Sequence, residues 1–158
     1  MKIIDSIQDF RFWRKKVKGT IGFVPTMGAL HDGHISLIKK SNKLCQHTVV
    51  SIYLNPMQFS PEEDLDTYPN TLELDLKILN KQQVDAVFLP TNSIMYPENF
   101  NTFVQESPLS NVLEGKSRPS FFKGVATVVV KLFNIVQPTH TFFGEKDAQQ
   151  LLIIKKII

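Results

Sequence analysis

The sequence contains little cysteine and no long apolar run. Its one cysteine, Cys45, excludes an internal disulfide, and no Cys or His partners surround it at the spacing of zinc ligands. We expect this thiol to be buried as a small apolar group. No window approaches the roughly 18 uncharged apolar residues of a membrane span, and the amino terminus has no basic-then-apolar secretory signal. These absences predict a cytoplasmic protein without a membrane partner.

Positive charge is missing from a long stretch of the chain, although the net charge is +3. No Lys or Arg occurs from Leu44 to Leu76, and a basic set follows later at Lys116, Arg118, Lys123 and Lys146. A cationic set beside glycine-bearing turns suits a phosphorylated small molecule better than a nucleic-acid duplex, which requires a broad basic stripe. No aromatic and basic residues interleave as in a base-stacking platform. The charge pattern therefore argues against a nucleic-acid partner.

The composition that remains is that of one globular domain. The hydrophobic fraction of 42% and the charged fraction of 21% are ordinary for such a domain. A chain of 158 residues is long enough to bury one core. We therefore treat residues 1–158 as a single domain.

Strand-like and helical apolar patterns alternate along the chain. Strands are expected at 20–25, 48–54, 86–89 and 141–143, and helices at 6–17, 34–43, 71–82, 125–136 and from 148 onward. This alternation implies parallel strands joined by right-handed crossovers, hence a doubly wound α/β fold. Between 90 and 123 the periodicity is weak and four prolines occur, so we expect an irregular, functional excursion with short elements.

Three polar, turn-rich segments follow expected strands, at 25–34, 55–64 and 144–147. In an open α/β sheet, ligands bind beyond the carboxyl ends of the strands. We therefore expect the three segments to meet around one crevice. Their convergence would be stronger support for a site than any one segment alone.

The sharpest motif is a pair of histidines, His31 and His34, at the expected start of a helix. Amide groups at a helix amino terminus favour anions, and imidazole can donate to phosphate oxygens as charge builds in a transition state. Gly28 and Gly33 allow the backbone to approach a triphosphate closely. A zinc site would need a third ligand, and neither His47 nor His140 is in an obvious register. Structural histidines remain the other alternative.

A second motif is the turn Gly144-Glu145-Lys146-Asp147. Its lysine can act as a point charge on phosphate. Surface turns often contain the same residue types, so this motif alone is weak support for a nucleotide site.

The sequence as a whole resembles the pantothenate synthetase (pantoate–β-alanine ligase) family. The resemblance includes GFVPTMGALHDGH at 22–34 and FGEKD at 143–147. It continues through residues 50–59, 63–65, 68–69, 113–115, 131–136 and 149–150. The matching segments span nearly the whole chain in the family's order.

The resemblance implies a Rossmann-like nucleotidylyltransferase fold, a homodimer, and two reaction steps. ATP and pantoate would give pantoyl adenylate and pyrophosphate, and β-alanine would then release pantothenate and AMP, with Mg²⁺ accompanying the nucleotide. The implied ATP site comprises Pro25, Thr26, Met27, Gly28, His31, Gly33, His34, Gly144, Lys146 and Asp147.

The resemblance also implies roles for individual residues of this sequence. His34 would be the proton donor, and His31 and Lys146 would contact phosphate. Pantoate would be held by Gln58 and Gln150. The candidates for Mg²⁺ or water-mediated contacts are Asp75 and Glu114, either of which could instead be a structural carboxylate.

The sequence departs from the family's pattern in three ways. Asn70 replaces the usual Arg after Tyr-Pro, and Phe121 replaces a histidine often near the active-site entrance. Family members also continue into a smaller carboxyl-terminal domain, which is preceded by a Ser-Ser-Arg segment that holds triphosphate. We expect this chain to be truncated, with that domain absent, to bind nucleotide weakly and to turn over poorly.

Two alternatives have other functions. One is a different nucleotidylyltransferase that moves adenylate onto a phosphate acceptor, although this leaves Gln58 and Gln150 unexplained. The other is a non-catalytic, dimerising fragment, which should not bind ATP.

Overall fold

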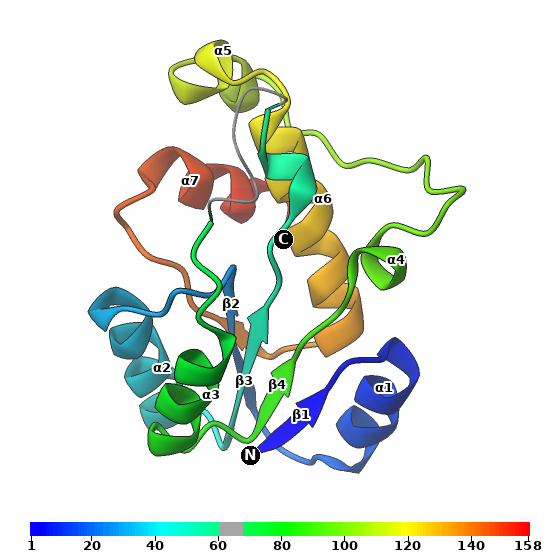
Figure 1. Cartoon of the computed structure of the whole chain (residues 1–158). Helices are drawn as coiled ribbons and strands as arrows, with labels where there is room; N and C mark the ends of the chain where they lie inside the picture. Colours follow the sequence, from blue (N-terminus) through cyan, green and yellow to red (C-terminus); the bar gives the residue numbers. More distant parts are fainter. Residues whose placement is uncertain (61–67) are drawn as a thin grey trace.

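A parallel β-sheet forms the centre of the protein, and a computed structural model describes residues 1–60 and 68–158 (Figure 1). Within this described part the sheet has five strands in the order β1-β4-β3-β2-β5. The strands are β1 (Lys2–Ile4), β2 (Ile21–Thr26), β3 (His47–Ile52), β4 (Ala86–Phe88) and β5 (His140–Thr141). Every pair in the sheet is parallel, which confirms the doubly wound α/β fold.

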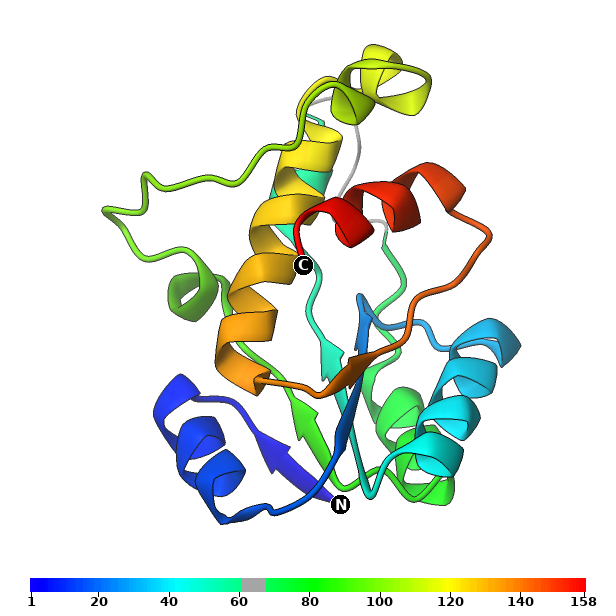
Figure 2. The same ribbon diagram turned by 180° about the vertical axis from the view of Figure 1, so that it is seen from behind.

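Helices cover both faces of the sheet (Figure 2). The larger apolar cluster joins one face of the sheet to α1 (Ile7–Lys16), α6 (Phe121–Val136) and α7 (Ala148–Lys156). The smaller cluster joins the other face to α2 (Asp32–Leu44) and α3 (Leu72–Lys81). Because both faces are covered, the central strands are buried on both sides and read in the sequence as continuous apolar runs.

The edge strand β1 was absent from the sequence-based prediction. It has three residues, of which Ile4 alone is buried. Such a short strand carries no readable alternation, and only its parallel pairing with β4 identifies it. The neighbouring helix was predicted correctly, because the side chain of Ser6 accepts the Asp9 N–H and caps its amino terminus.

The segment between β4 and α6 is irregular, as predicted, and carries three short elements. They are α4 (Asn92–Met95), η3 (Leu109–Asn111) and α5 (Glu114–Ser117). Helix α6 begins at Phe121, four residues before the predicted start, and one side of it packs in the core. The early start places Phe121 and Phe122 in the helix.

Helix α6 also packs closely against the short 3-10 helix η1 (Pro56–Gln58) that follows β3. A Cβ atom added to Gly124 would lie 2.2 Å from the Met57 carbonyl oxygen, so only glycine permits this approach. The close packing fixes η1 beside the carboxyl end of the sheet.

Cys45 is not buried as expected. It lies at the carboxyl-terminal cap of α2, where its backbone N–H donates to the Ser41 carbonyl. The residue is partly exposed. Partial desolvation raises the pKa of the thiol. None of the helices in residues 1–60 and 68–158 is long and apolar enough to cross a bilayer.

Candidate functional site

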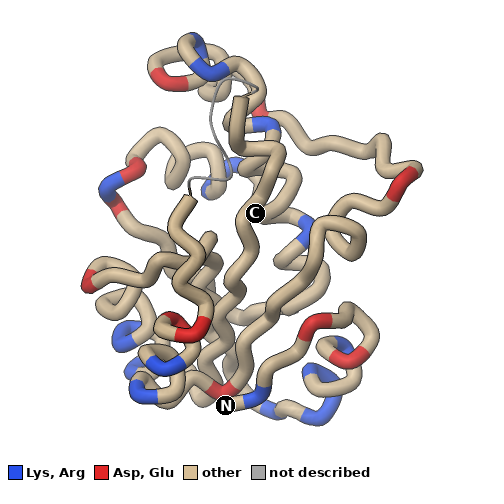
Figure 3. Tube along the Cα trace, in the orientation of Figure 1, with Lys and Arg blue, Asp and Glu red and all other residues tan. Residues whose placement is uncertain are grey.

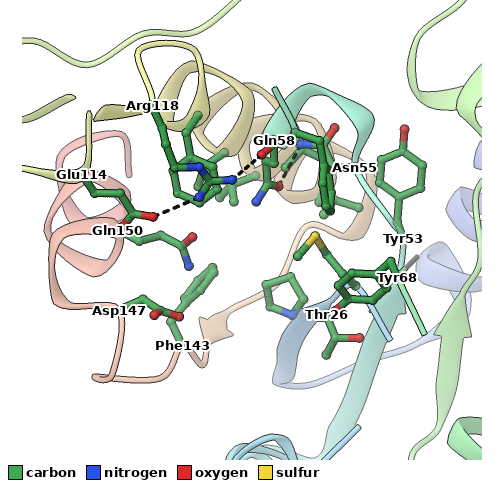
Figure 4. Close-up of a pocket in the computed structure, with 18 of the residues that line it drawn as sticks. Thr26, Tyr53, Asn55, Gln58, Tyr68, Glu114, Arg118, Phe143, Asp147 and Gln150 are labelled. Atoms are coloured by element: carbon green, nitrogen blue, oxygen red, sulfur yellow. Dashed lines mark hydrogen bonds and ion pairs between the residues drawn. The ribbon is translucent and has the colours of Figure 1, made fainter. Parts of the chain in front are cut away.

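A cavity of about 410 Å³ opens beyond the carboxyl ends of β2 and β3, between α6 and the loop that leads into α7 (Figure 4). Its volume lies in the range of small-ligand sites. The predicted site residues that line it are Pro25, Thr26, Met27, His34, Gln58, Asp147 and Gln150. Apart from Gln150, which lies in α7, they come from the three segments that the sequence placed after strands, so the predicted convergence is confirmed for the described residues. Positions 61–64 of the second segment, and the resemblance at 63–65, lie outside the described part.

The other predicted site residues do not line this cavity. They are Gly28, His31, Gly33, Asp75, Gly144 and Lys146. Lys146 lies on an exposed turn. The surface beside this turn is open, since a Cβ atom added to Gly144 would meet nothing within 4 Å. The expectation that Lys146 and His34 face the same cavity is therefore not met: His34 lines the cavity, Lys146 does not, and the neighbour of Lys146, Asp147, lines it.

The basic set expected beside phosphate is dispersed. Figure 3 shows many Lys and Arg on and beside α1, α2 and α3, toward the amino ends of the strands, and others scattered over α5, α6 and α7. Of the four cations in the predicted set, Arg118 alone lines the cavity among the described residues. Lys123 instead lies over the ring of Phe103 at 4.0 Å.

His31 and His34 form a reciprocal cap at the start of α2. The Gly33 N–H donates to Nδ1 of His31 at 3.1 Å, and the His31 N–H donates to Nδ1 of His34 at 3.4 Å. A ring nitrogen that accepts a hydrogen bond carries no proton, so in each neutral ring the proton is on Nε2. The two rings lie 4.1 Å apart between centroids. The cap therefore leaves both Nε2–H groups as donors beside a helix amino terminus.

The pKa of His34 is held below its usual value of 6.5, chiefly by burial and then by the neighbouring His31, while Asp75 acts in the opposite direction. At neutral pH the ring of His34 is consequently uncharged. It can donate through Nε2 without losing the acceptor role of Nδ1.

Asp75 holds the loop that precedes α2. Its side chain is buried, and its Oδ2 and Oδ1 accept the N–H groups of Ala29 and Leu30, both at 2.9 Å. Oδ2 also accepts the Thr71 hydroxyl at 3.0 Å. Ala29 has a φ of 50°, a left-handed conformation that these bonds stabilise. Asp75 faces a second cavity of about 440 Å³, which shares Met27 with the first.

The Mg²⁺ role of Asp75 stays a prediction. In residues 1–60 and 68–158 no cluster of three or more His, Cys, Asp or Glu side chains stands at metal-binding geometry. Asp75 Oδ1 accepts one hydrogen bond and Oδ2 accepts two, so Oδ1 retains a lone pair.

Gln58 is held by a buried amide that the sequence reasoning missed. Asn55, which is 1% exposed, donates through Nδ2 to Gln58 Oε1 at 2.8 Å and to the Gly124 carbonyl at 3.2 Å. The Tyr96 hydroxyl donates to Asn55 Oδ1 at 2.9 Å. In the sequence, Asn55 is visible only as the residue before Pro56, where the expected strand ends. That position does not indicate which residues Asn55 bonds to.

Arg118 is the second residue that the sequence-based site missed. Its guanidinium donates to the Gln58 carbonyl at 2.9 Å and to Glu114 Oε1 at 3.0 Å, and it lies 3.9 Å over the ring of Phe121 (Figure 4). Glu114 was predicted as a contact to metal or water, and it lines the cavity as the partner of this guanidinium.

Gln149 anchors the same wall of the cavity from α7. Its Nε2 donates to the carbonyls of Leu109 and Val112 at 2.9 and 2.7 Å, and its Oε1 accepts the Glu114 N–H at 3.2 Å. The adjacent Gln150 points its side chain to the cavity instead.

The parallel sheet, the histidine-capped helix and the cavity beyond the strand ends define a Rossmann-like domain of the nucleotidylyltransferase class. A family model described as pantoate-beta-alanine ligase matches residues 2–158. The chain belongs to this family.

Individual relatives agree with this assignment. A pantothenate synthetase from Thermosipho africanus is 49% identical over 161 residues, which cover 100% of this chain and 58% of the relative. One from Roseiflexus castenholzii is 48% identical and is covered to 56%. The chain thus spans little more than half the length of these relatives.

Solved structures of relatives share the fold. A pantoate-beta-alanine ligase from Francisella tularensis, complexed with beta-gamma ATP and beta-alanine, superposes with a TM-score of 0.96 at 45% identity. The match covers 99% of this chain and 61% of that protein. Pantothenate synthetase from Thermus thermophilus gives a TM-score of 0.93 at 44% identity, covering 99% and 56% of the two chains.

Proposed function

We propose that this chain is the ATP- and pantoate-binding part of a pantothenate synthetase, which joins pantoate to β-alanine through pantoyl adenylate. The observation that carries the proposal is that His34, Gln58, Asp147 and Gln150, from separate segments, line one cavity. Membership of the family, and the Francisella tularensis relative with its nucleotide and β-alanine, support it.

The nucleotide end of the cavity is formed by the start of α2 and the turn before α7. The Nε2–H groups of His31 and His34 would donate to phosphate oxygens, aided by the amino terminus of the helix. His34 would stabilise the leaving pyrophosphate as its charge builds. Lys146, on the exposed turn, would contact phosphate. Gly28, Gly33 and Gly144 would contact the nucleotide through their backbone atoms.

The acid end of the cavity combines two amides with an apolar wall. Gln58 and Gln150 would hold the hydroxyl and carboxylate groups of pantoate. Residues of α6 would pack against its methyl groups and keep water from the acyl adenylate. These wall residues are Val125, Val128, Val129 and Leu132.

The reaction needs alignment more than covalent participation by the protein. A pantoate carboxylate oxygen attacks the α-phosphorus, and the bond to the bridging oxygen breaks to release pyrophosphate. The β-alanine amine then attacks the acyl carbon, loses a proton, and displaces AMP as the amide forms. Fixed amides and imidazoles contribute by holding the reacting groups in line.

Mg²⁺ is proposed as the metal that accompanies ATP. It usually takes one or two carboxylates together with substrate phosphates. Asp75 Oδ1 keeps a free lone pair and would offer it from the second cavity, which adjoins the first at Met27. When bound, it would neutralise charge on the phosphates. A homodimer, as the resemblance implies, and a cytoplasmic location, as expected from the sequence, complete the proposal.

Calorimetric titration with ATP and with pantoate tests the proposal. The chain should bind both ligands, His34→Ala should weaken ATP, and Gln58→Ala should weaken pantoate, each by roughly tenfold for the loss of a hydrogen bond to a charged ligand. His140→Ala, an exposed histidine outside the cavity, is the matched control. Absence of heat with both ligands would favour a non-catalytic fragment, and binding of a phosphate acceptor in place of pantoate would favour another adenylyl transferase.

A further inference from the structure

Arg118 joins three segments that are far apart in the sequence. It follows α5, pairs with Glu114 within that segment, reaches the backbone of η1, and stacks on the first residue of α6. It is a half-buried cation in the cavity lining, with its side chain 28% exposed. A planar guanidinium can satisfy a carbonyl and a carboxylate while its face rests on an aromatic ring, which a lysine ammonium cannot do.

The residue that Arg118 reaches is the one assigned to the acid substrate. Gln58 ends a three-residue 3-10 helix, which has few hydrogen bonds of its own. Its side-chain amide is held by Asn55, and its carbonyl is held by Arg118. The Asn55 bond orients the side-chain amide of Gln58, and the Arg118 bond holds the backbone from which that side chain extends.

Phe121 supplies the flat surface on which the guanidinium rests. Its phenyl ring lies 3.9 Å beneath the guanidinium and lines the cavity. A phenyl ring neither titrates nor donates, so it offers the cation an apolar face at every pH. Phe121 in turn packs edge-on against the fully buried Phe122, with ring centroids 5.0 Å apart.

We propose that Arg118, stacked on Phe121, is a positioning residue that sets affinity for the hydroxy acid by fixing Gln58. The inference rests on the proposed function of the cavity. It predicts a separation of effects, because Arg118 and Gln58 lie across the cavity from Thr26 at the nucleotide end (Figure 4).

The decisive variant is Arg118→Lys, measured by calorimetric titration in the whole chain. It keeps the positive charge but loses the fork of donors and the flat stacking surface. Pantoate affinity should fall at least about tenfold, while ATP affinity should stay within about twofold. Arg11→Lys, an exposed arginine on α1, is the matched control and should change neither. Phe121→Leu, which keeps an apolar side chain without the ring face, should lower pantoate affinity by a smaller factor.

A second measurement does not depend on pantoate. The carbonyl ¹³C signal and the side-chain amide signals of Gln58 should both move in Arg118→Lys, with the melting temperature close to that of the parent chain. If the parent chain binds no pantoate, the proposed function fails, while displaced Gln58 signals would still support the positioning role.

Two outcomes would overturn the inference. One is unchanged pantoate affinity with unmoved Gln58 signals in Arg118→Lys. The other is an equal loss of ATP and pantoate affinity with a lowered melting temperature, which would show that Arg118 acts only on the stability of the fold.

Discussion

The two walls of the cavity are built in different ways. The wall at the start of α2 is held mostly by bonds between neighbours in the sequence, such as the cap between His31 and His34, with Asp75 as its main distant support. The wall around Gln58 has one local bond, from Asn55, and is otherwise held by Arg118 and Gly124, which lie 60 and 66 residues further along the chain than Gln58. A motif can reveal the first kind of wall, whereas the second exists only once the chain has folded.

The largest expected effect tests the one distant support of the first wall. Asp75→Ala leaves the partly buried N–H groups of Ala29 and Leu30 without their acceptor, so we expect a loss of about 3 kcal/mol in the free energy of unfolding. Urea denaturation measures it. Glu73→Ala, an exposed carboxylate on the same helix, is the control and should change stability little. Equal stability of the two variants would show that the local cap alone suffices.

Adding a single methyl group at Gly124 tests the close packing of the second wall. In Gly124→Ala the new Cβ would meet the Met57 carbonyl, so η1 must shift. We expect a destabilisation of about 2 kcal/mol and weaker pantoate binding. Gly144→Ala, where the new atom meets nothing within 4 Å, is the control for stability. An undisturbed Gln58 in a crystal structure of Gly124→Ala would contradict the close packing described here.

The local cap should have a smaller effect. His31→Ala removes the acceptor for the Gly33 N–H, and we expect a loss of about 1 kcal/mol, as for other helix caps. Thermal unfolding at pH 7, compared with His140→Ala, measures it. A loss as large as that of Asp75→Ala would reverse the ranking of the two supports.

The smallest effect is a dependence of stability on pH. Because the folded state lowers the pKa of His34 below 6.5, the unfolded chain binds that proton more readily. The corresponding stability is fully present above pH 6.5 and is lost as the pH falls through the lowered pKa. An NMR titration of the His34 ring should give this pKa directly. Denaturation at pH 5 and pH 7 should differ less for His34→Ala than for the parent chain.

The contrast between the walls also explains what could be predicted from the sequence. The strands β2, β3 and β4 were predicted because their apolar runs are buried on both faces. The paired histidines were found because a helix start places them side by side. Arg118 was seen only as part of a basic set, since nothing near it in the sequence indicates that it bonds to Gln58. Periodicity also placed the start of α6 too late, because Phe121 faces the cavity rather than the centre of the core.

Helix α6 has a consequence for any attempt to change which acid the protein accepts. Val125, Val128, Val129 and Leu132 are each at most 5% exposed and belong to the core, yet the same four side chains form the apolar lining of the cavity. Replacing one of them with a smaller residue to admit a bulkier acid would also remove packing between the helix and the sheet. Each such change would lower the free energy of unfolding by roughly 1–4 kcal/mol. A library that varies these positions would therefore need compensating changes elsewhere in the core, and selectivity for the acid and resistance to heat would change together.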